Sequence, residues 1–125
     1  MGAVRRVVIV DDDGDIRLML RLMIGSEEDL EIVGEAADGR EGVEVVLEQN
    51  PDLVVMDLMM GGLNGIDATR AIKKAAPEVQ VIGFTSARDD VSAHEMEGAG
   101  IAVRVQKTET KGLLPVIRRV LDLRD

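Results

Sequence analysis

Short apolar runs alternate with amphipathic segments along all 125 residues of the chain. The apolar runs are rich in valine and isoleucine, which is typical of strands buried on both faces of a sheet. They predict strands at 7–10, 31–36, 53–56, 79–84 and 101–105. The segments that follow repeat apolar residues three and four positions apart and predict helices at 13–26, 39–49, 66–76, 90–99 and 110–123.

Five strands, each followed by a helix over a short connection, define the predicted fold. Such connections make right-handed crossovers, so the strands lie parallel and the helices cover both faces of the sheet. We therefore predict a single doubly wound α/β domain, (βα)5, over residues 1–125, with no output domain in this chain. The positions expected to point inward are Ile16, Met19, Leu20 and Met23, then Val43, Val46 and Leu47, and lastly Leu113, Leu114, Ile117, Val120 and Leu121. Arg17 and Arg21 are expected on the outer face of the first helix.

Composition narrows the classes of function that this domain can have. The chain has 24 acidic and 15 basic residues, a net charge of -9, no cysteine and one histidine. The lack of cysteine excludes disulfides, thiolate zinc sites and cysteine nucleophiles. The acidic balance and the single aromatic residue, Phe84, argue against direct binding of nucleic acid by this chain. No apolar run reaches the roughly 18 residues of a membrane helix, so we expect a cytoplasmic domain with no membrane partner.

Polar side chains capable of chemistry stand at the ends of four predicted strands. Asp11 and Asp12 follow the first strand, Asp57 the third, Thr85 the fourth and Lys107 the fifth. Ligands of doubly wound sheets bind outside the carboxyl ends of the strands, at the point where the strand order reverses. We therefore expect three carboxylates, a hydroxyl and an ammonium group at one edge of the sheet.

Three carboxylates in one pocket need a counter-charge. Two of them about 4 Å apart repel by roughly 4 kcal/mol at an effective dielectric constant of 20, and Lys107 alone cannot balance three acids. An all-oxygen site suits Mg²⁺, which usually binds one or two carboxylates together with phosphate oxygens. A phosphoryl group there would meet the metal, Lys107 and Thr85, and a carboxylate could accept it as an aspartyl phosphate.

These residues occur in an order that is known from one protein family. The motifs are Ile9-Val10-Asp11-Asp12, Val54-Val55-Met56-Asp57-Leu58-Met59-Met60, Gly83-Phe84-Thr85-Ser86-Ala87 and Lys107. The steps from Asp12 to Asp57, Thr85 and Lys107 are 45, 28 and 22 residues. In these motifs the chain resembles, over essentially its whole length, the receiver domain of two-component response regulators, which has a CheY-like fold. Residues 32–39 are most similar to receivers of the LuxR/NarL type. The resemblance implies a flavodoxin-like strand order, 2-1-3-4-5.

The resemblance also implies a role for each matching residue. Asp57 would accept a phosphoryl group from a cognate sensor histidine kinase, and the domain would catalyse only the phosphorylation and dephosphorylation of its own aspartate. Asp12 and Asp57 would bind Mg²⁺ directly together with the Met59 backbone carbonyl, and Asp11 would act through water. Thr85 would move toward the phosphate and change the face formed by the fourth helix, fifth strand and fifth helix. That face, or the first and fifth helices, would form a homodimer, and a C-terminal domain absent here would regulate transcription.

The sequence departs from the family pattern at two positions. Gly61 stands four residues after Asp57, where the family usually has proline, and predicts a looser loop. Arg104 stands three residues before Lys107, where the family has its switch aromatic. The output signal would then depend on Arg104 pairing with acids, or on another route.

Two other functions remain open at this point. A pseudo-receiver would keep the fold as an interaction module without accepting phosphate, and Gly61 and Arg104 favour it. A haloacid-dehalogenase-type phosphatase would use Asp11 as its nucleophile, because Asp11-Asp12-Asp13-Gly14 also resembles the first motif of that family. Against it, Asp57 would have no role, and Asp89-Asp90 precede Lys107 where an acid pair should follow.

Overall fold

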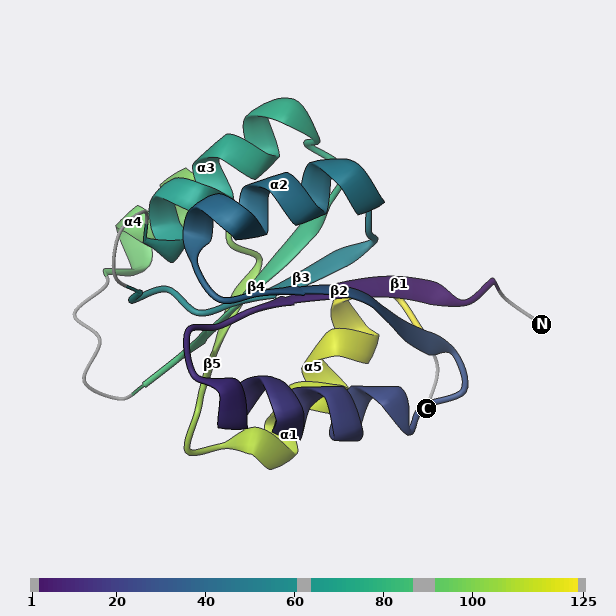
Figure 1. Ribbon diagram of the computed structural model, residues 1–125. Helices are drawn as coiled ribbons and strands as arrows, with labels where there is room; N and C mark the ends of the chain where they lie inside the picture. Colours follow the sequence, from purple (N-terminus) through teal and green to yellow (C-terminus); the bar gives the residue numbers. More distant parts are fainter. Residues whose placement is uncertain (1–2, 61–63, 87–91, 124–125) are drawn as a thin grey trace.

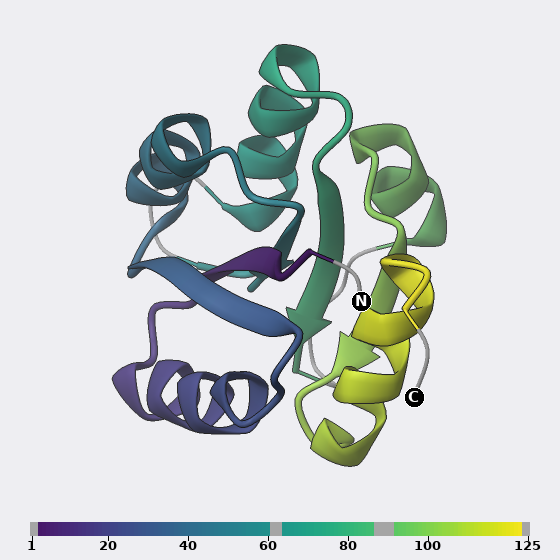
Figure 2. The ribbon, with the colours of Figure 1, turned by 90° about the vertical axis from the view of Figure 1, so that its right-hand side faces the viewer.

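A computed structural model describes residues 3–60, 64–86 and 92–123, and shows one parallel sheet between two layers of helices (Figure 1). The strands are β1 (Arg5–Val10), β2 (Leu30–Ala36), β3 (Leu53–Met56), β4 (Gln80–Thr85) and β5 (Val103–Gln106). The helices are α1 (Gly14–Gly25), α2 (Gly39–Gln49), α3 (Gly65–Ala75), α4 (Ala93–Ala99), the 3₁₀ helix η1 (Thr110–Gly112) and α5 (Leu113–Val120). The view in Figure 2 shows α1 and α5 on one face of the sheet and α2, α3 and α4 on the other.

The strand order is β2-β1-β3-β4-β5, and every pair of neighbours is parallel. The predicted doubly wound fold and its strand order are therefore confirmed. The chain adds β2 on one side of β1 and the later strands on the other, so the order reverses between β1 and β3. This reversal leaves the carboxyl ends of β1 and β3 uncovered by a crossover, which is where doubly wound sheets bind ligands.

Two apolar cores form because successive strand residues point to opposite faces of the sheet. On β1, Val7 and Ile9 pack with α1 and α5, whereas Val8 and Val10 pack with the helices of the other face. Phe84, the single aromatic residue, is fully buried on the side of α1 and α5. Every residue that we expected to point inward from the last helix belongs to this core.

Several element boundaries differ from the predictions. The last helix begins as η1 before it becomes α5. The third helix was predicted to begin at residue 66, but α3 begins one residue earlier, at Gly65, with Asn64 as its N-cap. Leu47 was expected to point inward, but this prediction is wrong because its side chain is 49% exposed.

Some predictions fall on residues that the structure does not describe. These are the start of the fourth helix at Asp90, the acid pair Asp89-Asp90 and the loop residue Gly61. Within the described ranges, no helix is long and apolar enough to cross a membrane.

Candidate functional site at the carboxyl edge of the sheet

The register of β1 and β3 brings Asp11 and Asp57 side by side. Val10 and Met56 are partners in the parallel ladder, and each is followed directly by one of these aspartates. The backbone fixes both residues, because the Asp57 amide donates to the Val10 carbonyl at 2.8 Å. The Asp11 amide donates to the Ala36 carbonyl at 3.0 Å at the end of β2.

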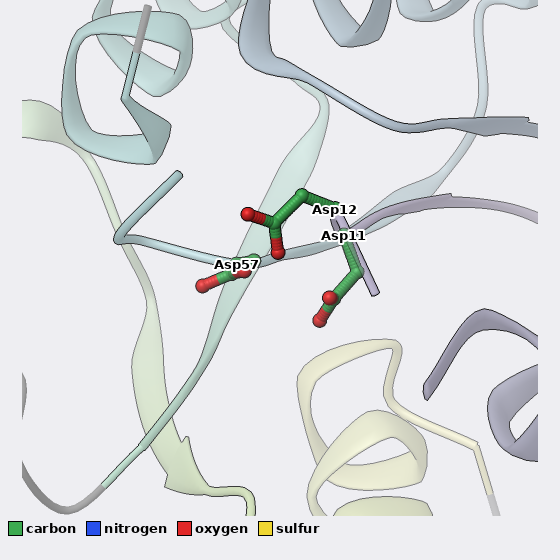
Figure 3. Close-up of side chains that lie close together, drawn as sticks. All are labelled: Asp11, Asp12 and Asp57. Carbon is green, nitrogen blue, oxygen red and sulfur yellow. The ribbon is translucent and has the colours of Figure 1, made fainter. Parts of the chain in front are cut away.

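Three carboxylates meet at this edge, as the sequence predicted (Figure 3). Asp11, Asp12 and Asp57 each offer an oxygen, and these oxygens all lie within 4.8 Å of one another. Asp11 and Asp57 are buried, with 1% and 3% of their surface exposed, whereas Asp12 is exposed. The pocket therefore has two desolvated acids and one that faces solvent, and this all-oxygen set suits a hard divalent cation.

Lys107 reaches the two buried acids from the end of β5. Its ammonium nitrogen lies 2.9 Å from Asp11 Oδ2 and 3.3 Å from Asp57 Oδ2. The contact with Asp11 is an ion pair without the angles of a hydrogen bond, and Asp11 Oδ2 accepts no hydrogen bond within the described part of the chain. The Lys107 amide donates to the Thr85 carbonyl at 2.7 Å, which ties the lysine to the end of β4.

Burial and mutual repulsion change the acidity of this group of residues. Burial, and then the charge of Asp11, raises the pKa of Asp57 to about 6, although the Met59 amide and Lys107 act in the opposite direction. Burial also lowers the pKa of Lys107, but its contacts with Asp11 and Asp57 together outweigh this and raise the pKa. The lysine therefore stays charged, and the buried acids remain under-neutralised.

Thr85 ends β4 with its side chain fully buried. Its hydroxyl has no hydrogen-bond partner among the residues that the structure describes. A buried hydroxyl without a partner is costly, and a ligand oxygen in the pocket would relieve that cost. Arg104, by contrast, is exposed on β5 and lines a surface pocket with Met96 and Glu97 of α4.

Two features of the site were not expected from the sequence. Gly65 lies so close to the end of β3 that a Cβ atom there would stand 2.1 Å from the Asp57 carbonyl oxygen. Arg17 was expected on the outer face of its helix, but it is partly buried, and its Nη1 donates to the Asp11 carbonyl at 2.7 Å. The glycine at position 65 was the one sequence signal for the close approach of α3 to Asp57. No feature of the sequence indicated that the Arg17 side chain would reach the Asp11 carbonyl.

The site residues are thus brought together largely as predicted. Asp11, Asp12, Asp57 and Lys107 form one cluster, and Thr85 joins it through the backbone. The Met59 amide donates to Asp57 Oδ1 at 3.1 Å, and the Met59 side chain is half exposed at the rim. Next to this cluster, Asp13 is the N-cap of α1, and its side chain accepts from the Asp15 amide.

Comparison with known proteins agrees with this site. The family model described as the response regulator receiver domain matches residues 7–117. The transcriptional regulatory protein LiaR of Bacillus subtilis is 37% identical over 103 residues, which cover 82% of this chain and 49% of that protein. The response regulator protein VraR of Staphylococcus aureus is 33% identical over 115 residues, covering 91% and 55% respectively.

Solved structures agree as well. The response regulator domain of Thermotoga maritima CheB matches with a TM-score of 0.86 and 33% identity, over 98% of this chain and 99% of that one. A two-component response regulator of the LuxR family from Aurantimonas sp. SI85-9A1 matches with a TM-score of 0.88 and 31% identity, over 96% and 86%. The chain spans about half the length of the curated relatives that it matches. Its fold, its acidic edge and these matches show that the chain belongs to the receiver domain family of two-component response regulators.

Proposed function

We propose that this domain accepts a phosphoryl group on Asp57 from the phosphohistidine of a cognate sensor histidine kinase. The observation that carries the proposal is the placement of one ammonium group, Lys107, between two buried carboxylates that it cannot fully neutralise. Asp11, Asp12, Asp57 and the Met59 backbone carbonyl would hold Mg²⁺, which supplies positive charge for the phosphoryl oxygens when bound.

The transfer would use Asp57 as the nucleophile. A carboxylate oxygen of Asp57 forms a bond to phosphorus while the phosphorus–nitrogen bond of the donor breaks, and its electron pair leaves with the imidazole. Because the pKa of Asp57 is about 6, this carboxyl group is largely ionised at neutral pH. Lys107 would pair with one phosphoryl oxygen, and the Thr85 hydroxyl would donate to another. Water would later attack the phosphorus, the phosphorus–oxygen bond to Asp57 would break, and inorganic phosphate would leave as the Asp57 carboxylate is restored. The domain would thus reverse only its own modification.

Phosphorylation would change the face formed by α4, β5 and α5. Thr85, whose hydroxyl has no partner within the described ranges, would gain one in the phosphate and shift the equilibrium between two arrangements. Arg104 would change its position as part of this rearrangement, because it lines the same surface pocket as the acidic Glu97 of α4. We further propose that this face, or the face of α1 and α5, forms a homodimer.

The output would be control of transcription. LiaR is named a transcriptional regulatory protein, and both curated relatives are about twice as long as the matched segment. We propose that residues 1–125 form one receiver domain, and that transcriptional output belongs to the half of such proteins that this chain does not match. A cytoplasmic location and the absence of direct contact with nucleic acid or membrane by this domain are part of the same proposal.

The pseudo-receiver and the phosphatase are not favoured by the comparisons. A phosphatase with Asp11 as nucleophile would also leave the buried carboxylate of Asp57 without a role.

The test is phosphorylation by a small acyl-phosphate donor in the presence of Mg²⁺. Wild type and Asp11→Asn are expected to incorporate phosphate, with a lower rate for Asp11→Asn, whereas Asp57→Asn is expected to incorporate none. Label that persists in Asp57→Asn and disappears in Asp11→Asn would instead indicate the phosphatase. Absence of label in all three proteins, with any donor, would indicate the pseudo-receiver.

A further inference from the structure

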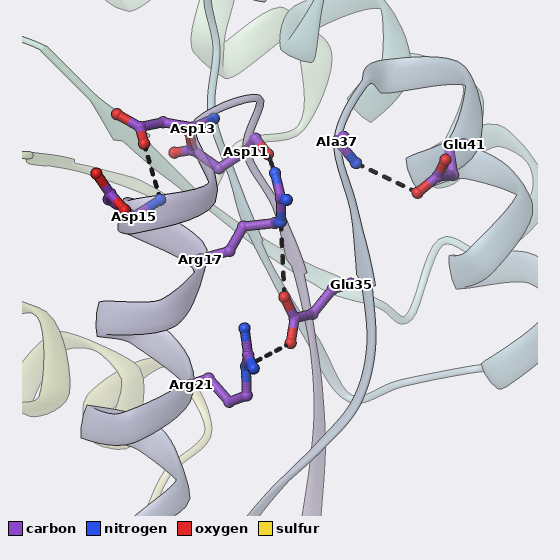
Figure 4. A network of polar contacts seen from close by, with 8 residues as sticks. All are labelled: Asp11, Asp13, Asp15, Arg17, Arg21, Glu35, Ala37 and Glu41. Carbon is purple, nitrogen blue, oxygen red and sulfur yellow. Dashed lines mark hydrogen bonds and ion pairs between the residues drawn. The ribbon is translucent and has the colours of Figure 1, made fainter.

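Asp11 is held through both of its backbone polar groups. Its amide donates to the Ala36 carbonyl at 3.0 Å. Its carbonyl accepts from Nη1 of Arg17 at 2.7 Å (Figure 4). The carboxylate then accepts from the Asp13 amide at 2.9 Å. The peptide group between Asp11 and Asp12 is therefore oriented by a side chain of α1.

Arg17 is itself held by an acid from a neighbouring strand. Its Nε lies 3.6 Å from Glu35 Oε1, and Arg21 Nε lies 2.8 Å from Glu35 Oε2 (Figure 4). The side chains of Arg17 and Glu35 are only 25% and 26% exposed, whereas that of Arg21 is 51% exposed. Glu35 directly precedes Ala36 on β2, so adjacent residues fix the two sides of Asp11.

We infer that Arg17 is a positioning residue for the carboxylates of Asp11 and Asp12, which it orients through the Asp11 carbonyl. Glu35 is the anchor of Arg17, because a guanidinium group has donors in two directions and can bond the carbonyl while facing the glutamate. The part of this inference that concerns Mg²⁺ rests on the proposed function. A lysine at this position carries the same charge but cannot bridge both groups.

The charge of Arg17 and its positioning role predict opposite changes in Mg²⁺ affinity when the side chain is removed. A cation close to a metal site repels the metal, so simple electrostatics predicts tighter Mg²⁺ binding in Arg17→Ala. A residue that orients metal ligands strengthens binding, and its loss typically weakens metal affinity by about tenfold or more. Arg21→Ala is the matched control, because it removes the same charge from the same glutamate without touching Asp11.

The first measurement is the dissociation constant of Mg²⁺ by calorimetry at about 0.15 M ionic strength, where exposed charges are screened beyond roughly 8 Å. We expect about tenfold weaker binding in Arg17→Ala, partial recovery in Arg17→Lys, and a change of less than about twofold in Arg21→Ala. Unchanged or tighter binding in Arg17→Ala, or equal weakening in Arg21→Ala, would overturn the inference.

The second measurement needs no metal and separates this inference from the proposed function. Hydrogen exchange of the Asp11 and Asp13 amides, followed by NMR, reports the order of the acidic segment directly. Both amides are expected to exchange several-fold faster in Arg17→Ala than in Arg21→Ala, while the helical circular dichroism stays the same. The backbone amide of Arg17 donates a hydrogen bond to the Asp13 carbonyl, and an alanine at this position would keep that bond. If wild type binds no Mg²⁺ the proposed function fails, and equal exchange in the two variants would then still refute the positioning role.

Discussion

The ammonium nitrogen of Lys107 lies 2.9 Å from Asp11 Oδ2 and so joins the end of β5 to the end of β1 across two intervening strands. The same nitrogen lies 3.3 Å from Asp57 Oδ2. One ammonium group thus pairs with two buried acids. The arrangement stabilises the fold only in part, and it leaves the pocket attractive to further positive charge.

Removal of the lysine charge should destabilise the domain. Lys107→Met would leave the two buried carboxylates without their counter-ion, and loss of one partner of a buried pair costs roughly 3 kcal/mol. Urea unfolding at neutral pH without divalent cations measures this loss, which should shrink near pH 5 because Asp57 takes up a proton. Lys111→Met, which removes an exposed lysine of η1, should have almost no effect. Equal stability of the two variants would contradict the proposed role of Lys107.

The raised pKa of Asp57 predicts a specific dependence of stability on pH. Between its ordinary value of 3.8 and about 6, the folded domain holds a proton that the unfolded chain has already lost. The free energy of unfolding therefore falls as pH rises through this window, by roughly 3 kcal/mol in all. Asp57→Asn should remove this fall and be more stable than wild type at neutral pH. Parallel urea titrations from about pH 4 to about pH 8 make the comparison, and identical pH profiles would refute the assignment.

Mg²⁺ should stabilise the folded domain, because the three carboxylates come together only in the folded state. At 100 times the dissociation constant the gain is about 2.7 kcal/mol, which thermal unfolding detects as a higher midpoint. Asp12→Asn should lose most of this gain while folding normally, since Asp12 is exposed. Asp15→Asn removes the same charge from the first turn of α1, outside the cluster, and should keep the gain. A similar loss in both variants would indicate a general charge effect.

Gly65 is expected to be intolerant of any side chain. A Cβ atom would stand 2.1 Å from the Asp57 carbonyl oxygen and 2.6 Å from Leu58 Cα, and neither backbone atom can move without shifting Asp57. Gly65→Ala should therefore cost about 3 kcal/mol or prevent folding. Gly98→Ala is the matched control, because it lies within α4 and its Cβ would meet nothing within 4 Å. Urea unfolding should show it gaining roughly 0.5–1 kcal/mol; a loss comparable to that of Gly65→Ala would contradict the packing argument.

The fold and the acidic edge of the sheet could be predicted from simple geometry. The apolar runs predicted where the strands lie, and the carboxyl ends of parallel strands share one edge of the sheet. Asp11, Asp57 and Lys107 follow such ends and therefore lie close together. The assignment of Asp57 as acceptor came from the family pattern rather than from geometry.

The unpredicted part depended on contacts between distant segments. Arg17 looked like a solvated residue on the outer face of its helix, but Glu35 of β2 draws it toward the Asp11 carbonyl. Leu47 directly follows the buried Val46 of α2, yet its own side chain is 49% exposed. Helical periodicity gives the direction of a side chain but not the extent of the surface that it meets.

Identification of the phosphorylated residue tests the central proposal most directly. The domain is treated with an acyl-phosphate donor and Mg²⁺, and borohydride then reduces the acyl phosphate, which converts the modified aspartate to homoserine. Peptide mass spectrometry should locate homoserine at position 57 and nowhere else, and should find none when the donor is omitted. Homoserine at position 11, or at no position although the domain is folded and binds Mg²⁺, would contradict the proposed function.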